Sequence, residues 1–201
     1  MAFHIDEPVA GNALFGRERD IKYVCENCVE TVRKRGQRCF IALIGIRKVG
    51  KSSIIHEVKR RYDEVSDIYV TVINCYEWRH NSNNFFKYYA IQVMNEFMKR
   101  RGYLDGVKLL PEPITSDYVE HFDEMIQSIR SLSSEALNRG ALALEVLQRP
   151  EITTEQRAAA YRTIIYLPQY LAEEAEIYFQ IIFDEFQEIA NLNKLPEVSN
   201  Y

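Results

Sequence analysis

Phe40-Ile-Ala-Leu-Ile-Gly45-Ile-Arg-Lys-Val-Gly50-Lys51-Ser52-Ser53 carries the strongest structural signal in this chain. An apolar run rich in branched residues is followed by the spacing G-x-x-x-x-G-K-S, and apolar residues then recur at helical intervals. This order predicts a strand over 38–45, a glycine-containing turn and a helix over 50–63. The alternative is a turn that matches the spacing by chance, and the flanking strand and helix patterns count against it.

The turn has the chemistry of a phosphate-binding loop. Gly45 and Gly50 let the backbone turn tightly, so that successive N–H groups point into one concavity where a phosphate fits. Lys51 would reach the β- and γ-phosphates, and the Ser52 hydroxyl would ligate Mg²⁺. The helix that begins near Gly50 adds its positive dipole end. The residues predicted to bind the nucleotide in this phosphate loop are Gly45, Ile46, Arg47, Lys48, Val49, Gly50, Lys51, Ser52 and Ser53.

A second, acidic element lies far downstream. The run over 177–183 is mostly apolar and ends at Asp184 and Glu185, which suits a strand of a parallel sheet covered on both faces. Asp184 would hold Mg²⁺, directly or through water. Glu185 would polarise the attacking water as a general base. The alternative is a strand that ends in two solvated carboxylates.

Three segments together support a family resemblance. They are Phe15-Gly16-Arg17-Glu18-Arg19-Asp20, the phosphate loop, and Ile182-Phe183-Asp184-Glu185-Phe186-Gln187. They resemble successive signatures of the archaeal ATPase domain family, which belongs to the STAND class of signal-transduction ATPases and is related to AAA+ proteins. The resemblance implies a Walker A loop over 45–52, a Walker B strand that ends at Asp184 and Glu185, and ATP with Mg²⁺ as ligands. It also implies that Gly16 and Arg17 lie close to the adenine and ribose. Ser52 stands where family members often carry Thr, and either residue supplies a hydroxyl.

The fold implied by the resemblance is an α/β P-loop NTPase of the ASCE or AAA+ type, in which a parallel sheet of strand order 5-1-4-3-2 is flanked by helices. Residues 1–201 would form a single ATPase domain, with a large helical insert over 102–176 before the Walker B strand. Only sixteen residues follow Glu185, so the C-terminal strands have no sequence to form them. We therefore expect this chain to be the N-terminal part of a longer ATPase, or its sheet to be completed by another chain or by rearrangement.

Periodicity predicts the remaining elements. A first helix over 17–36 is followed, beyond the phosphate loop, by a strand over 67–75 and a helix over 83–100. Within the insert, Thr153 and Gln156 resemble a capping box that opens a helix ending or kinking at Pro168. The other helical signals of the insert are an amphipathic stripe over 118–129 and an apolar stretch over 137–147. We expect the insert to contact a partner or simply to cover the sheet.

Composition indicates a globular cytoplasmic protein. The net charge is −4, and no apolar run is long enough to cross a membrane. The pair Cys25-x-x-Cys28 suggests a metal site, but no second ligand pair follows at a suitable spacing. Both cysteines instead belong to the apolar stripe of the first helix.

Three predicted helices end in clusters of Lys and Arg, at 33–35, 59–61 and 99–101. These clusters suggest a nucleic-acid surface. The simpler interpretation is favoured, because cations in a last helical turn complement the helix dipole and the chain is acidic overall.

Two functional classes fit these observations. The first is an ATP-hydrolysing switch or motor subunit in which Lys51 and Glu185 are the catalytic residues, Ser52 and Asp184 hold the metal, and a protein partner or a second copy receives the signal. The second is a scaffold without turnover that binds a nucleotide or a partner, and the resemblance admits roles in DNA replication or mobile elements. A small-molecule kinase is disfavoured, because adjacent carboxylates suit the activation of water.

Overall fold

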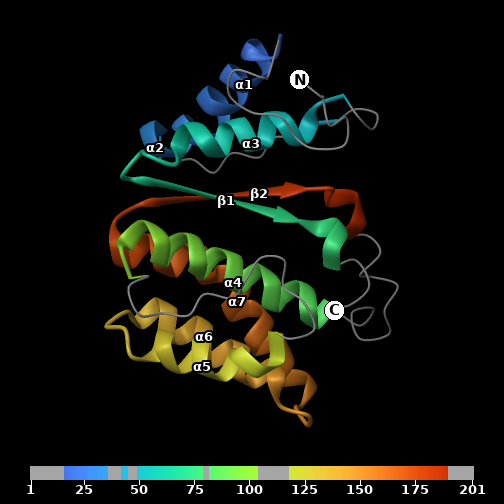
Figure 1. The fold of residues 1–201 in the computed structure, drawn as a ribbon, viewed down its shortest axis with the longest axis vertical. Helices are drawn as coiled ribbons and strands as arrows, with labels where there is room; N and C mark the ends of the chain where they lie inside the picture. Colours follow the sequence, from blue (N-terminus) through green and yellow to red (C-terminus); the bar gives the residue numbers. More distant parts are fainter. Residues whose placement is uncertain (1–15, 36–41, 45–48, 79–81, 104–117, 190–201) are drawn as a thin grey trace.

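A computed structural model describes residues 16–35, 42–44, 49–78, 82–103 and 118–189. The described helices lie on both faces of a small sheet (Figure 1). On one face lie α1 (Glu18–Val24), α2 (Glu30–Arg35) and α3 (Lys51–Tyr62). On the other face lie α4 (Ser82–Arg101) and α7 (Thr154–Ala175), with α5 (Tyr118–Arg130) and α6 (Glu135–Gln148) beyond them. The chain is therefore α/β and mostly helical.

The sheet consists, within the described residues, of two parallel strands. They are β1 (Ile68–Asn74) and β2 (Tyr178–Asp184), and they pair in register from Ile68 opposite Tyr178 to Asn74 opposite Asp184. The long crossover between them contains α4 to α7. In the order 5-1-4-3-2 these segments are the second and third strands, which are neighbours, so the pairing is compatible with the expected fold.

The strand predicted over 38–45 is not formed where the structure describes it. Ala42, Leu43 and Ile44 lie outside both strands, and Ile44 is 93% exposed. In the expected order this strand pairs with strands four and five, which are not among the described elements. Without hydrogen-bonding neighbours a single strand gains too little to form. The rest of the predicted strand lies outside the described residues.

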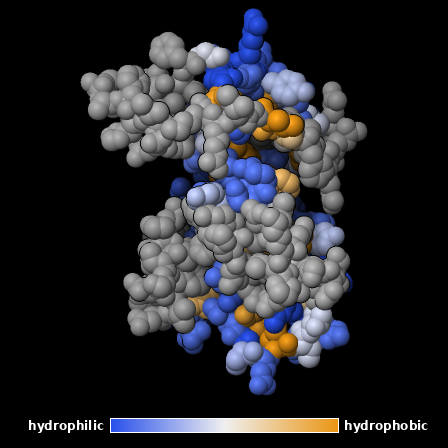
Figure 2. All heavy atoms as spheres, turned by 90° about the vertical axis from the view of Figure 1, so that its right-hand side faces the viewer, coloured by the Kyte–Doolittle hydropathy of each residue, from blue (hydrophilic) through white to orange (hydrophobic). Residues whose placement is uncertain are grey.

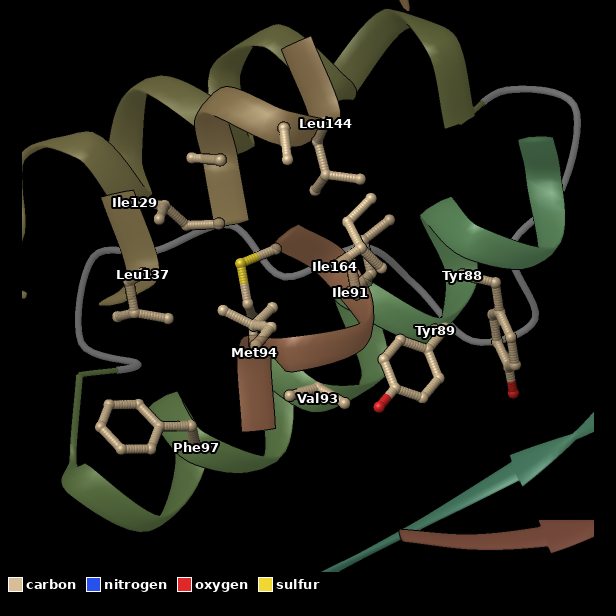
Figure 3. Packing of buried hydrophobic residues seen from close by; sticks show 14 of the residues in the cluster. Tyr88, Tyr89, Ile91, Val93, Met94, Phe97, Ile129, Leu137, Leu144 and Ile164 are labelled. Carbon is tan, nitrogen blue, oxygen red and sulfur yellow. The ribbon is translucent and has the colours of Figure 1, made fainter. Parts of the chain in front are cut away.

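Side chains of β1 alternate between two hydrophobic clusters. Ile68 and Val70 face α1 and α3 and form a smaller cluster with Val58 and Tyr62. Tyr69 and Ile73 face the other helical layer and belong to the larger cluster. That cluster includes Met94, Phe97, Ile129, Leu137, Leu144 and Ile164, all at most 1% exposed (Figure 3). Burial on both faces explains why β1 is almost continuously apolar.

The first predicted helix contains an irregularity. A π-helical turn, Cys25–Val29, separates α1 from α2. Ile21 and Val24 are buried as the apolar stripe predicts, and Cys25 is half-buried against the smaller cluster. The side chain of Cys28 lies outside the described part of the structure.

The described part of the predicted insert consists mainly of the helices α5, α6 and α7, which are joined by short turns. The capping box at the start of α7 is confirmed: the Gln156 N–H donates to Thr153 Oγ1 at 3.2 Å, and the Thr153 N–H donates to Gln156 Oε1 at 2.9 Å. Pro168 does not end this helix, which continues to Ala175. Leu167 and Leu171 beside it are fully buried, so packing offsets the hydrogen bond that proline cannot make.

Candidate nucleotide site

The helix after the phosphate loop begins where the spacing predicts. Gly50 precedes α3 in the left-handed conformation, with φ 87°, a region that glycine enters without the strain of a side chain. The Ile54 N–H donates to the Gly50 carbonyl at 3.1 Å and closes the first turn. In the described structure no side chain caps this end of the helix, so its N-terminal N–H groups and positive dipole end suit an anion.

Of the predicted phosphate loop, the structure describes Val49 to Ser53. Lys51 and Ser52 are half-buried and Ser53 is buried, because Ser53 begins the face of α3 that packs toward β1. Gly45, Ile46, Arg47 and Lys48 lie outside the described residues.

The Arg17 side chain contacts this loop at Val49, although the two residues are 32 positions apart in the sequence. Gly16 has a φ of 73° and leads into α1, which packs against α3. The Arg17 guanidinium donates to the Val49 carbonyl oxygen and also, at 2.9 Å, to Asp20 Oδ2. The family resemblance implies that Gly16 and Arg17 share the nucleotide site, and the structure brings the Arg17 side chain to the backbone of Val49.

The acidic residues lie at the carboxyl end of β2. Asp184 is the last residue of the strand, opposite Asn74. Glu185 follows with a φ of 52°, a left-handed conformation that costs energy for any residue with a side chain. The Glu185 N–H donates to Asp184 Oδ1 at 2.9 Å, and the Glu185 carboxylate accepts a hydrogen bond from Gln187 Nε2. Gln187 lies in the 3₁₀ turn η4 (Phe186–Glu188), so this turn supplies a donor to the Glu185 carboxylate.

The start of α3 and the acidic end of β2 lie at the same edge of the sheet. Parallel strands place their carboxyl ends together, and α3 runs antiparallel to them, so the start of α3 lies at that edge (Figure 1). Ligands of open α/β folds bind at this edge. Figure 2 views the molecule from this side and shows hydrophilic side chains at the height of the sheet.

The carboxylates at this edge affect a neighbouring thiol. Cys75 opens the 3₁₀ turn η3 (Cys75–Trp78) after β1 and is 1% exposed. The pKa of the Cys75 thiol is raised from 9.0 to about 12, chiefly by burial and to a lesser degree by the negative charges of Asp184, Glu185 and Glu188. The thiol is therefore neutral near pH 7, while the negative potential at this edge favours a cation.

These residues fit Mg²⁺ and a triphosphate. No cluster of three or more His, Cys, Asp or Glu side chains suited to a metal occurs among the described residues. Magnesium does not need one, since it keeps several waters and takes one or two protein oxygens together with substrate phosphates. Asp184 offers Oδ2, which has no hydrogen-bond partner in the described structure, and Ser52 offers a hydroxyl at the start of α3.

Comparisons with known protein families, curated proteins and solved structures give no match.

Two contacts at the site are not predicted by sequence reasoning. One is the hydrogen bond from Arg17 to the Val49 carbonyl, which depends on how α1 packs against α3. The other is the bond from Gln187 to Glu185. The sequence signals this bond only by an amide side chain two residues after Glu185, the predicted general base.

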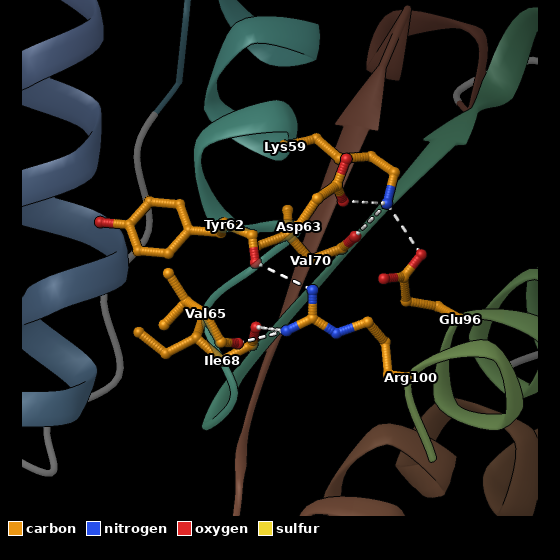
Figure 4. Close-up of polar contacts among 8 residues, drawn as sticks. All are labelled: Lys59, Tyr62, Asp63, Val65, Ile68, Val70, Glu96 and Arg100. Atoms are coloured by element: carbon orange, nitrogen blue, oxygen red, sulfur yellow. Dashed lines mark hydrogen bonds and ion pairs between the residues drawn. The ribbon is translucent and has the colours of Figure 1, made fainter. Parts of the chain in front are cut away.

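The basic cluster at the end of α3, residues 59–61, makes hydrogen bonds and ion pairs with other parts of the chain, and Figure 4 shows those of Lys59. Lys59 contacts Asp63, Glu96 and the Val70 carbonyl. Arg60 and Arg61 both bond the buried carboxylate of Glu57. From the end of α4, Arg100 donates to the carbonyls of Tyr62, Val65 and Ile68. These cations of α3 and α4 are therefore paired with acceptors inside the fold. Separately, no described helix is both long and apolar enough to span a membrane.

Proposed function

We propose that this chain binds Mg·ATP at the phosphate loop and hydrolyses it slowly, as a nucleotide-dependent switch or motor subunit. One observation carries the proposal: the uncapped start of α3, after a left-handed Gly50, lies at the same sheet edge as Asp184 and Glu185. A positive helix end beside two carboxylates is what a triphosphate and its metal require.

Each residue has a distinct task in the proposed reaction. The N–H groups at the start of α3 and the Lys51 ammonium bind the β- and γ-phosphates. The Ser52 hydroxyl and Asp184 hold Mg²⁺, which when bound would neutralise charge on the phosphate oxygens. Glu185 accepts a proton from water as the water oxygen bonds the γ-phosphorus and the bond to the bridging oxygen breaks. Gln187 keeps the Glu185 carboxylate in place.

The test is calorimetric titration of Mg·ATP into the full chain, followed by phosphate release. Lys51→Ala should abolish binding, and the matched control Lys34→Ala, at a 70%-exposed side chain, should not. Glu185→Gln should keep binding and lose turnover, whereas Glu151→Gln at an exposed turn should keep both. The proposal fails if folded wild-type protein does not bind Mg·ATP, and its catalytic part fails if Glu185→Gln turns over as the wild type does.

A scaffold without turnover is the second candidate, and the outer edge of β2 favours it. In the described structure β2 pairs only with β1, and all its residues are half-buried whereas most of β1 is buried. An edge of this kind can accept a strand from a partner protein. Binding of ATP without measurable phosphate release would favour this candidate.

A further inference from the structure

Arg17 contacts the backbone of the phosphate loop. Its guanidinium donates to the Val49 carbonyl, and Nη1 donates to Asp20 Oδ2 at 2.9 Å. Its Nε atom lies 3.9 Å from the position that a β-carbon would take on Gly50. Arg17 therefore lies against the peptide that joins Val49 to Gly50, and Asp20 fixes its other arm.

The geometry of that peptide gives the contact a consequence. A peptide unit is planar and trans, so the Val49 carbonyl and the Gly50 N–H point in opposite directions. With the carbonyl held toward Arg17, the Gly50 N–H points to the opposite side of the loop. A phosphate loop works through backbone N–H groups that converge on one side. Holding one carbonyl outward thus keeps one N–H directed inward.

We infer that Arg17 is a positioning residue for the phosphate loop: it orients the Val49–Gly50 peptide, with Asp20 holding the guanidinium, and it does not recognise the base or ribose. The ligand class it serves is the phosphate chain of a nucleotide. This inference rests on the proposed function and differs from what the family resemblance implies for Arg17. A planar guanidinium with several donors can hold the carbonyl and the carboxylate together, which an ammonium does less well.

The first experiment compares Mg·ATP with Mg·tripolyphosphate, a probe that has no base or ribose. Dissociation constants would be measured by calorimetry for the full chain. Arg17→Ala should weaken both ligands by the same factor, about tenfold for one oriented hydrogen-bond donor. Arg17→Lys and Asp20→Asn should weaken both by less. The exposed neighbour Arg19→Ala serves as the control and should change neither. Weakening of ATP alone would overturn the inference and assign Arg17 to the nucleoside, and unchanged binding of both ligands would also overturn it.

The second experiment needs no ligand. Polarisation of the Val49 carbonyl alters the amide of the next residue, so Arg17→Ala should shift the ¹⁵N–¹H resonance of Gly50. Gly102, with a φ of 70° at the end of α4, is a matched glycine that should not shift. Arg17→Lys should shift Gly50 by a smaller amount, and circular dichroism would verify that each variant is folded.

The two experiments separate the two proposals. Failure of wild-type protein to bind either ligand sinks the proposed function, whereas a Gly50 shift in Arg17→Ala still supports the orienting contact. An unshifted Gly50 resonance in a folded variant overturns the inference whatever the protein binds.

Discussion

The Nζ atom of Lys59 lies 2.8 Å from Oε2 of Glu96, which joins the helix after the phosphate loop to α4 (Figure 4). The same ammonium donates to the Val70 carbonyl at 3.0 Å, so β1 lies within the same set of contacts. The Glu96 side chain is 9% exposed and that of Lys59 25%. This contact fixes the far end of α3, and the start of α3 is thereby held at the opposite edge of the sheet.

Replacing Lys59 with Met should destabilise the protein by about 2–3 kcal/mol, because Glu96 is then left as a buried charge without its cation. Oε1 of Glu96 is buried and has no hydrogen-bond partner within the described residues, so no neighbouring donor there offsets the loss of the Lys59 ammonium. Urea unfolding would measure the change. The double variant Lys59→Met with Glu96→Leu should recover most of it.

The control for this pair is Lys22→Met. The Lys22 side chain is 71% exposed and its Nζ lies 3.7 Å from Glu26 in the π-helical turn that follows α1, so the expected change is below about 0.5 kcal/mol. Equal losses of unfolding free energy in Lys59→Met and Lys22→Met would contradict the view that burial makes the Lys59–Glu96 pair important for stability.

Gly140 allows α6 to approach its neighbours closely. A β-carbon at this position would lie 3.1 Å from Leu167 Cδ1 and Cδ2 and from Met94 Sδ. Gly140→Val should therefore lower the unfolding free energy by about 2–3 kcal/mol through overpacking, although valine favours helix more than glycine does. Thermal and urea unfolding would test it. Leu142→Ala, at a 50%-exposed position on the same helix, should change stability little, and a neutral Gly140→Val would show that the helices can separate without cost.

Stability should fall at alkaline pH partly through Cys75. Its folded-state pKa of about 12 lies above the 9.0 of an exposed thiol, so the neutral thiol favours the folded state. Its contribution is complete below pH 9 and is lost as the pH rises toward 12, by about 4 kcal/mol in total. Between pH 8 and about pH 10.5, wild-type protein should lose about 2 kcal/mol more than Cys75→Ala.

Tyr62 and Tyr89 also have raised pKa values, chiefly through burial. Both tyrosines are present in the wild type and in Cys75→Ala. The difference between wild type and Cys75→Ala therefore isolates the thiol. Parallel pH profiles would contradict the assignment of this sensitivity to Cys75.

Gln187→Ala should lower kcat for ATP about tenfold and leave KM unchanged, because it frees the Glu185 carboxylate without touching the phosphate loop. Steady-state phosphate release would measure both constants. Gln169→Ala is the matched control, since Gln169 donates to Glu173 at 2.8 Å in α7. A change in KM with constant kcat would contradict the proposal that Gln187 positions the carboxylate of the general base Glu185.

Several features could be predicted because they depend on local patterns. The Thr153 capping box is a contact between residues three apart, and the left-handed Gly50 follows from a spacing that requires glycine. The strand ending at Asp184 could be identified from its apolar run. The prediction of a strand over 38–45 is wrong for the described residues 42–44. An apolar run gives no information on whether a neighbouring strand is present to pair with it.

The sequence by itself determined where α3 begins, where β2 ends and which side chains stand at these two points, because spacing and periodicity act within a few residues. Only the tertiary structure decided that Arg17 contacts Val49, that Lys59 reaches Glu96 and that β1 and β2 pair directly. These relationships depend on how two helical layers pack against the opposite faces of one sheet. Such packing depends on the shapes of residues far apart in the chain, and no local pattern encodes it.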